Sequence, residues 1–153
     1  MQAPWLTRVA GAFVLLGAAV FGWIEVGFRA EIDQEAQFLE SVASEVASLV
    51  DADQHETIHT NADADGAAFQ TIRHALRITQ ERRGIDSPIY TLRPTDAGDT
   101  EFVVMTNETP FIGDRYAGRD AMRPVFAEGQ RARTGLYGDD HGRWISAYAP
   151  ITT

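Results

Sequence analysis

The sequence contains no cysteine and no lysine, and the absence of cysteine excludes several kinds of chemistry. Without cysteine there are no disulfides, no thiolate metal ligands and no thiol nucleophile. The 22 acidic residues outnumber the 13 basic ones, all of them arginine, and the net charge is −9. Nucleic acid is therefore not expected as a partner, because binding it requires a basic surface.

Long apolar runs are also scarce, since only residues 9–28 reach the length of roughly 20 residues that crosses a bilayer as a helix. We expect this run to be a transmembrane helix retained as a signal anchor. A cleaved secretory signal is the alternative, but cleavage after Ala30 would place Phe28 where a small residue is normal. Either way, the residues that follow are exported.

The flanks of the run indicate its orientation. Arg8 and the free amino terminus favour residues 1–8 in the cytoplasm, although Arg29 on the far flank weakens that asymmetry. We expect one pass through the inner (cell) membrane, with the C-terminal domain periplasmic or extracellular. The domain after the anchor is long enough for a single core of ordinary size.

Residues 29–50 continue the helical pattern as a membrane-proximal long helix. A narrow apolar stripe recurs at heptad spacing, formed by Ile32, Leu39, Val42, Val46 and Leu49. The stripe pairs with its copy in a parallel homodimer, or it packs on its own domain. The run is short for a coiled coil. We therefore expect packing on the domain together with a dimer seam on another face of the helix.

The spacing of apolar residues changes from helical to strand-like along residues 51–153, which we expect to form the folded domain. A polar turn precedes a helix at 67–83 that Gly84 ends, in the position where a left-handed cap is common. The later elements are predicted from alternation and turn residues: strands at 88–93 and 101–106, a loop at 107–120, a short helix at 121–130, and strands at 134–137 and 144–151 around the turn 138–142. The fold class is α+β.

Three stretches resemble a known family, namely PIYTLRP (88–94), TEFVVMTNE (100–108) and LYGDDHGRWISAYAPI (136–151). Together with the two N-terminal helices, they resemble Cache-type, PAS-like extracytoplasmic sensor domains of bacterial histidine kinases, chemotaxis receptors and nucleotide cyclases. In such proteins a further strand, a second membrane helix and an output module follow. The resemblance therefore implies that this sequence is a fragment, incomplete at its C-terminus.

Alternation in WISAYAPI (144–151) separates two faces of a strand. The face with small alanines suits the long helix, which leaves the aromatic face free to line a cavity. Pockets favour aromatic walls with a few hydrogen-bonding groups. We therefore expect the ligand-binding residues to be Trp144, Ser146 and Tyr148, joined by Tyr90, Asp114, Arg123 and Tyr137. The alternative is that these aromatic side chains simply fill the second face of the sheet.

His55-Glu56-Thr57-Ile58-His59 matches the His-Glu-x-x-His pattern of zinc metallopeptidases. That chemistry needs both histidines on one helical face, with the glutamate acting on the metal-bound water. The polar surroundings and the missing third ligand favour an ordinary polar turn, so we expect no metal and no cofactor here.

The sequence thus predicts the sensor region of a membrane-bound signalling protein, which takes a small-molecule ligand, forms a homodimer through the long helix and is not itself an enzyme. A membrane-anchored zinc hydrolase that uses His55, Glu56 and His59 is one alternative. An anchored dimerisation module that senses no ligand is the other.

Overall fold

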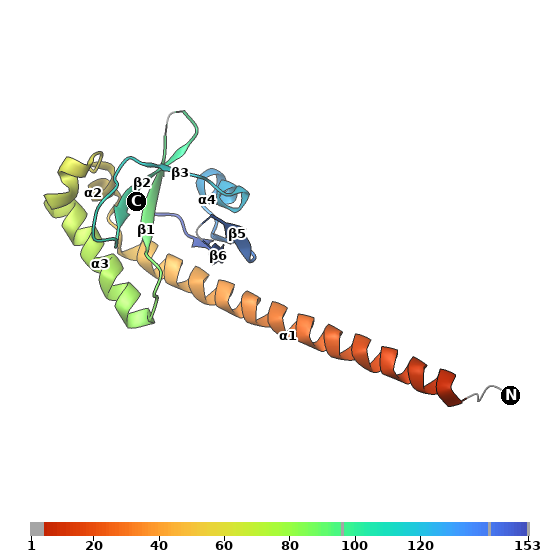
Figure 1. Ribbon diagram of the computed structural model, residues 1–153. Helices are drawn as coiled ribbons and strands as arrows, with labels where there is room; N and C mark the ends of the chain where they lie inside the picture. Colours follow the sequence, from red (N-terminus) through yellow and green to blue (C-terminus); the bar gives the residue numbers. More distant parts are fainter. Residues whose placement is uncertain (1–4, 96, 141, 153) are drawn as a thin grey trace. The chain divides into compact units, whose positions relative to one another are not determined.

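The computed structural model describes the backbone of residues 5–95, 97–140 and 142–152, with side chains from residue 27 onward in those ranges. The chain divides into two compact units, Met1–Glu35 and Ala36–Thr153. The architecture is α+β, as the sequence predicts: long helices come first, followed by small antiparallel sheets and one short helix (Figure 1).

The first helix, α1 (Trp5–Leu49), is continuous, as predicted for residues 9–50. The predicted membrane segment, residues 9–28, lies outside the residues whose side chains are described, except for Gly27 and Phe28. Among the residues whose side chains the structure describes, no helix is both long and apolar enough to span a bilayer.

In the second unit, the end of α1 buries one face in the core. Val42, Val46 and Val50 are buried in the main apolar cluster, and Phe38 packs against that cluster. These residues are four apart, which places them on one side of a helix. The predicted packing of the stripe on its own domain is thus confirmed for Val42 and Val46, whereas Leu49 is 51% exposed.

A short helix, α2 (Ala52–Glu56), follows where the sequence suggested only a polar turn. It forms because Asp51 caps it, accepting a hydrogen bond from the Gln54 backbone N–H at 2.9 Å. A 3₁₀ turn, η1 (Asn61–Asp65), leads to α3 (Ala67–Arg83). The predicted bounds of α3 are confirmed, since Gly84 ends it with φ +66° in the left-handed region.

The main sheet has the order β1–β2–β3 and is antiparallel throughout. Its strands are β1 (Tyr90–Pro94), β2 (Thr100–Met105) and β3 (Arg115–Tyr116). The first two strands match the predicted pair, with Arg93 opposite Glu101. The third lies in the predicted loop at 107–120, because a strand of two residues is too short to show alternation.

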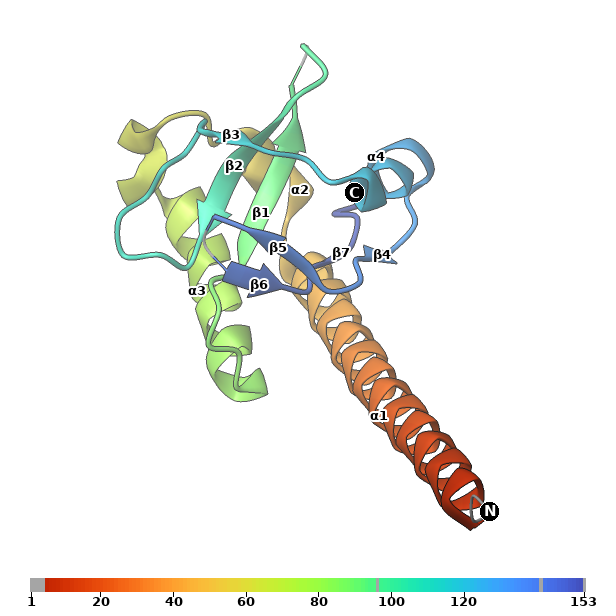
Figure 2. The same ribbon diagram turned by 45° about the vertical axis from the view of Figure 1, so that its right-hand side comes forward.

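The core lies between α3 and the main sheet. Phe69, Ile72 and Leu76 of α3 and residues 103–105 of β2 are at most 2% exposed. On the opposite side of the sheet lie the C-terminal strands, as two views of the ribbon agree (Figure 1, Figure 2).

The C-terminal elements begin with a 3₁₀ turn, η2 (Asp120–Met122), and the short helix α4 (Arg123–Glu128), close to the predicted helix at 121–130. Two small ladders follow, in which β4 (Ala132–Arg133) pairs with β7 (Ala147–Tyr148), and β5 (Tyr137–Asp139) with β6 (Gly142–Trp144). The predicted single hairpin is thus two ladders. They are joined by hydrogen bonds between Thr134 and Ser146.

Candidate functional site

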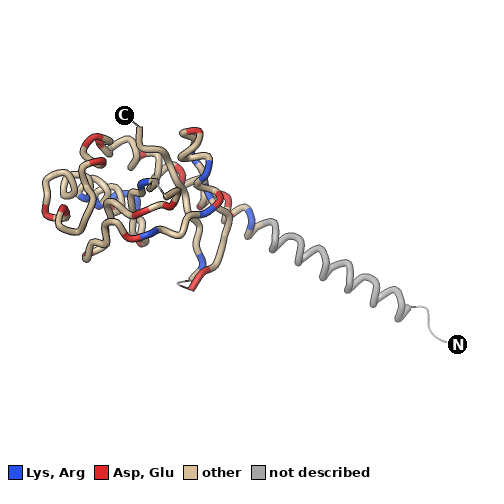
Figure 3. Tube along the Cα trace, turned by 90° about the horizontal axis from the view of Figure 1, so that it is seen from above, with Lys and Arg blue, Asp and Glu red and all other residues tan. Residues whose placement is uncertain are grey.

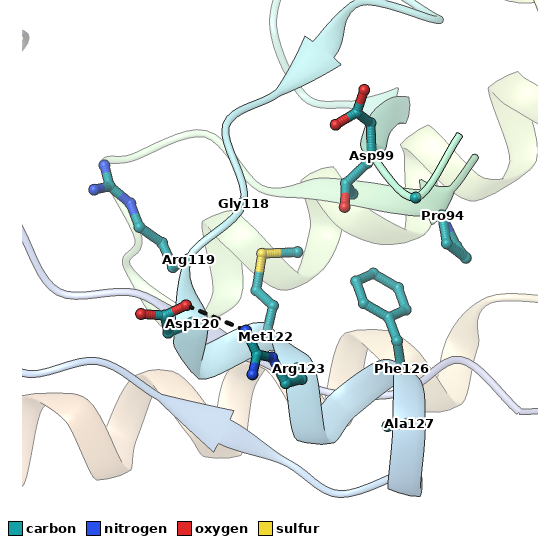
Figure 4. A pocket seen from close by; sticks show the side chains of 11 residues that line it. Pro94, Asp99, Gly118, Arg119, Asp120, Met122, Arg123, Phe126 and Ala127 are labelled. Carbon is teal, nitrogen blue, oxygen red and sulfur yellow. Dashed lines mark ion pairs between the residues drawn. The ribbon is translucent and has the colours of Figure 1, made fainter. Parts of the chain in front are cut away.

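A cleft of about 440 Å³ lies beside the main sheet, between the β1–β2 connection and the helical segment η2–α4. We call it the α4 cleft. It is lined by Pro94, Gly98, Asp99, Thr100, Gly118, Arg119, Asp120, Met122, Arg123, Phe126 and Ala127. Phe126 and Pro94 point toward each other across the opening (Figure 4). The cleft therefore offers an apolar wall within a charged rim.

Two ion pairs at the charged rim of the cleft differ in the distance between their charged groups. Arg115 Nη2 lies 2.5 Å from Asp99 Oδ1, whereas Arg123 Nη2 is 3.8 Å from Asp120 Oδ1, and both of the latter side chains are almost fully exposed. Exposed pairs at such a distance contribute little. Arg123 is thus the basic side chain of the cleft that is easiest to redirect toward a ligand. Acidic and basic residues are otherwise interspersed along this unit (Figure 3).

A second hollow of about 450 Å³ lies next to the cleft and shares Gly98, Asp99, Thr100 and Gly118 with it. Its other lining residues are Arg115, Tyr116 and Ala117. Gly118, between β3 and η2, therefore lines both hollows, whereas residues 115–117 line only the second.

Four hydroxyl groups meet in pairs at the side of the sheet that faces the C-terminal strands. The Tyr116 and Tyr148 hydroxyl oxygens are 3.1 Å apart, and the Tyr137 hydroxyl lies 2.7 Å from Ser146 Oγ. We call these four residues the tyrosine cluster. All four side chains are half-buried.

Arg119 joins this cluster to the cleft. Its guanidinium carbon lies 4.1 Å from the centre of the Tyr137 ring, within the range of a cation–π contact. Its Nη2 donates to Asp139 Oδ2 at 3.2 Å, and the Trp144 indole N–H donates to Asp139 Oδ1 at 2.8 Å. Arg119 Nε is buried and has no hydrogen-bond partner in the described part of the chain.

Phe102 forms the aromatic floor beneath the cluster. Its ring makes edge-to-face contacts with Tyr90 and Tyr116, both at 5.2 Å between ring centres, and with Phe111 at 4.8 Å. Burial is the main cause that raises the pKa of Tyr116, followed by its hydrogen bond with Tyr148. Burial likewise raises the pKa of Tyr90. Both phenols therefore stay neutral and serve as hydrogen-bonding groups, not as anions.

The structure brings most of the predicted ligand residues together, but it separates two of them. Tyr137, Ser146 and Tyr148 form the cluster; Trp144 reaches it through Asp139, and Tyr90 through Phe102. Arg123 lies in the cleft instead. Asp114 is exposed and is not part of either lining.

Sequence reasoning missed Arg119, Tyr116, Met122 and Phe126. Alternation along residues 144–151 identified part of the cluster, whereas these four lie in a two-residue strand, a loop, a 3₁₀ turn and a short helix, none of which shows a legible period. A signal was available for Arg119, because an arginine next to Asp120 in a Gly-containing loop is exposed by default. Which aromatic ring it would contact depends on the tertiary fold.

The His-Glu-x-x-His segment does not adopt the arrangement that zinc catalysis needs. The helix α2 ends at Glu56, so His59 lies beyond it, and the two histidines do not share a helical face. His55 is 4% exposed, and its Nε2 is 2.9 Å from Thr91 Oγ1. Burial, with the Arg93 charge second and Glu56 opposing, lowers the pKa of His55 to about 4. His55 is therefore a neutral core residue.

Among the residues that the structure describes, no three His, Asp or Glu side chains come together in a way that would hold a metal ion. Comparison with family models, with curated proteins and with solved structures finds no match to this chain. The fold and the site geometry are therefore the basis on which a function is inferred.

Proposed function

We propose that this chain is the extracytoplasmic, PAS-like sensor region of a membrane-bound signalling protein of the Cache type. One observation carries the proposal: α1, the helix that contains the predicted anchor, ends inside the sensor core. Val42, Val46 and Val50 belong to the same cluster as Val103 and Met105 of β2. A change in the packing of the sheet would therefore act directly on α1.

The ligand would bind in the α4 cleft, with the tyrosine cluster beside it. The cleft combines the apolar Phe126 and Met122 with the loosely paired Arg123. Arg119 also lines the cleft, and its buried Nε has no hydrogen-bond partner among the residues that the structure describes. Placed polar groups next to apolar walls are typical of small-molecule sites. We propose a small molecule with an apolar body and at least one hydrogen-bond acceptor.

Residues 9–28 would anchor the protein in the cell membrane, with the domain in the periplasm or outside the cell. A homodimer through α1 is part of the proposal. Leu49 and Phe28 each expose about half of their surface on this helix, at 51% and 49%. The dimer rests on the heptad-like spacing of apolar residues in this helix, because single exposed apolar side chains are common on protein surfaces.

Thermal unfolding of the full chain in detergent tests ligand binding. Amino acids, short carboxylic acids and amines are added one at a time. A compound at 100 times its Kd stabilises the folded state by about 2.7 kcal/mol, which raises Tm by roughly 10 °C. Arg123→Gln should reduce that rise, whereas Arg82→Gln, an exposed arginine paired with Glu45 away from the cleft, should keep it. An equal rise in both variants would remove the cleft from the proposal.

A second candidate function, a dimerisation module that binds no ligand, is favoured by the tyrosine cluster. Its hydroxyl groups bond to one another, so the aromatic face is already filled. The same screen separates the two candidates. A dimer that no compound of the panel stabilises would support the second function and contradict the first.

A further inference from the structure

We propose that Glu40 of α1 connects the wall of the α4 cleft to the long helix, so that a change in the shape of the cleft reaches α1 through this residue. The inference deepens the proposed function and rests on it for its biological meaning. The mechanical connection itself can be tested without any ligand.

Glu40 forms ion pairs with two arginines, Arg131 just before β4 and Arg133 within it. Its Oε2 lies 2.9 Å from Arg133 Nη1, and its Oε1 lies 3.8 Å from Arg131 Nε. The Glu40 side chain is 22% exposed, so it is partly shielded from water. A contact between residues 40 and 133 closes a loop of more than ninety residues, which makes it a link between the two ends of the folded unit.

The path from the cleft to these arginines is short and ordered. α4 supplies Arg123, Phe126 and Ala127 to the cleft wall. It ends at Gly129, whose left-handed φ of +64° turns the chain toward β4. The Gly129 and Gln130 backbone N–H groups donate to carbonyls of α4 at 3.2 and 3.3 Å, which fixes the direction in which the chain leaves the helix.

Buried side chains also hold α4 on the domain. Met122, in the preceding turn η2, and Val125 of α4 are 4% and 8% exposed, so the helix cannot rotate freely. Pairing with β7 keeps β4 extended. A displacement of α4 would therefore be transmitted to Arg131 and Arg133 and not absorbed by the connection.

The strength of the contact suits a switch. Ion pairs of this exposure are weak, so ligand binding can overcome them. A matched comparison is available on the same helix, because Glu45 also holds two arginines, Arg82 and Arg83 of α3, and Arg83 Nε is 3.3 Å away. Glu45 connects α1 to α3 and not to the cleft wall.

The experiment is a spin-label distance measurement in the full chain in detergent. The chain has no cysteine, so two introduced cysteines can be labelled specifically. Gln37→Cys on α1 and Ala127→Cys on the cleft wall are both at exposed positions. We expect one narrow distance distribution in the parent, a broadened one after Glu40→Gln, and a narrow one after Glu45→Gln.

A charge exchange provides the rescue. Glu40→Arg combined with Arg131→Glu and Arg133→Glu should restore the narrow distribution, which a purely local role of Glu40 would not predict. Hydrogen exchange of the β4 backbone amides should rise about 2- to 10-fold in Glu40→Gln, as expected for the loss of one or two such pairs.

Equal distributions and equal exchange in Glu40→Gln, Glu45→Gln and the parent would overturn the inference. Should Glu40→Gln unfold the domain, Arg131→Gln with Arg133→Gln removes the same contacts from exposed positions, and an unchanged distribution there would overturn it too. A positive result combined with no stabilising compound would instead leave the connection intact and contradict ligand sensing.

Discussion

His55 makes the stability of this domain dependent on pH. The ring is buried, and its Nε2 is 2.9 Å from Thr91 Oγ1, which accepts a hydrogen bond from the Val104 backbone N–H at 2.9 Å. The Thr91 hydroxyl can therefore form a second hydrogen bond with Nε2 of the neutral ring. A protonated ring would place an extra charge in this buried position, which burial disfavours.

The size of the effect follows from the two pKa values. Burial first, and the nearby Arg93 charge second, lower the pKa of His55 from 6.5 to about 4. The unfolded chain therefore takes up a proton near pH 6.5, and the folded state only near pH 4. Stability is fully present above pH 6.5 and falls as the pH drops toward 4, by about 3 kcal/mol in total at about 1.4 kcal/mol per pKa unit.

Urea unfolding of the parent, His55→Gln and His59→Gln between pH 7 and pH 4 measures the contribution of His55 to the pH dependence of the free energy of unfolding. The free energy of unfolding of the parent should fall by about 3 kcal/mol more than that of His55→Gln across the range. His59, which is exposed, serves as the control and should keep the slope of the parent. Parallel curves for the parent and His55→Gln, or an NMR titration midpoint of His55 near 6.5, would refute the reasoning.

Two further substitutions test the core and the sheet. Phe69→Ala removes a fully buried ring and should cost about 3–5 kcal/mol in urea unfolding, whereas Ile78→Ala, at a site 46% exposed, should stay within about 0.5 kcal/mol. Glu101→Gln breaks a cross-strand pair in which the Arg93 side chain is only 13% exposed, at an expected cost of about 1–3 kcal/mol. Glu108→Gln is its control, because that carboxylate is 96% exposed; equal losses in both variants would contradict the role of burial.

Local patterns predicted the regular elements well, because their causes are local. The bounds of α3 follow from its helical spacing and from Gly84, and the pair of strands on either side of residues 95–99 follows from alternation and turn residues. The heptad stripe of α1 was also predicted from the sequence. The partner against which the stripe packs was not, because packing on the domain and pairing with a second copy require the same apolar spacing.

The candidate site was predictable only in part. Alternation along residues 144–151 pointed to Ser146 and Tyr148, and each of them does contact another hydroxyl group. Arg119 and Tyr116 come from a segment without a period, so nothing in their neighbours along the chain indicates that they reach the same place. The contact between Glu40 and Arg133 likewise could not be predicted from the sequence.

The sequence by itself determined the order and type of the longer elements, the α+β class and the acidic, cysteine-free character of the chain, since each depends on residues close together or on composition. Only the tertiary structure decided that His55 is a buried neutral base and not one of two zinc ligands, and that Asp114 stands apart from the tyrosine cluster. Burial and long-range contacts set those outcomes, because they arise from residues distant in the chain.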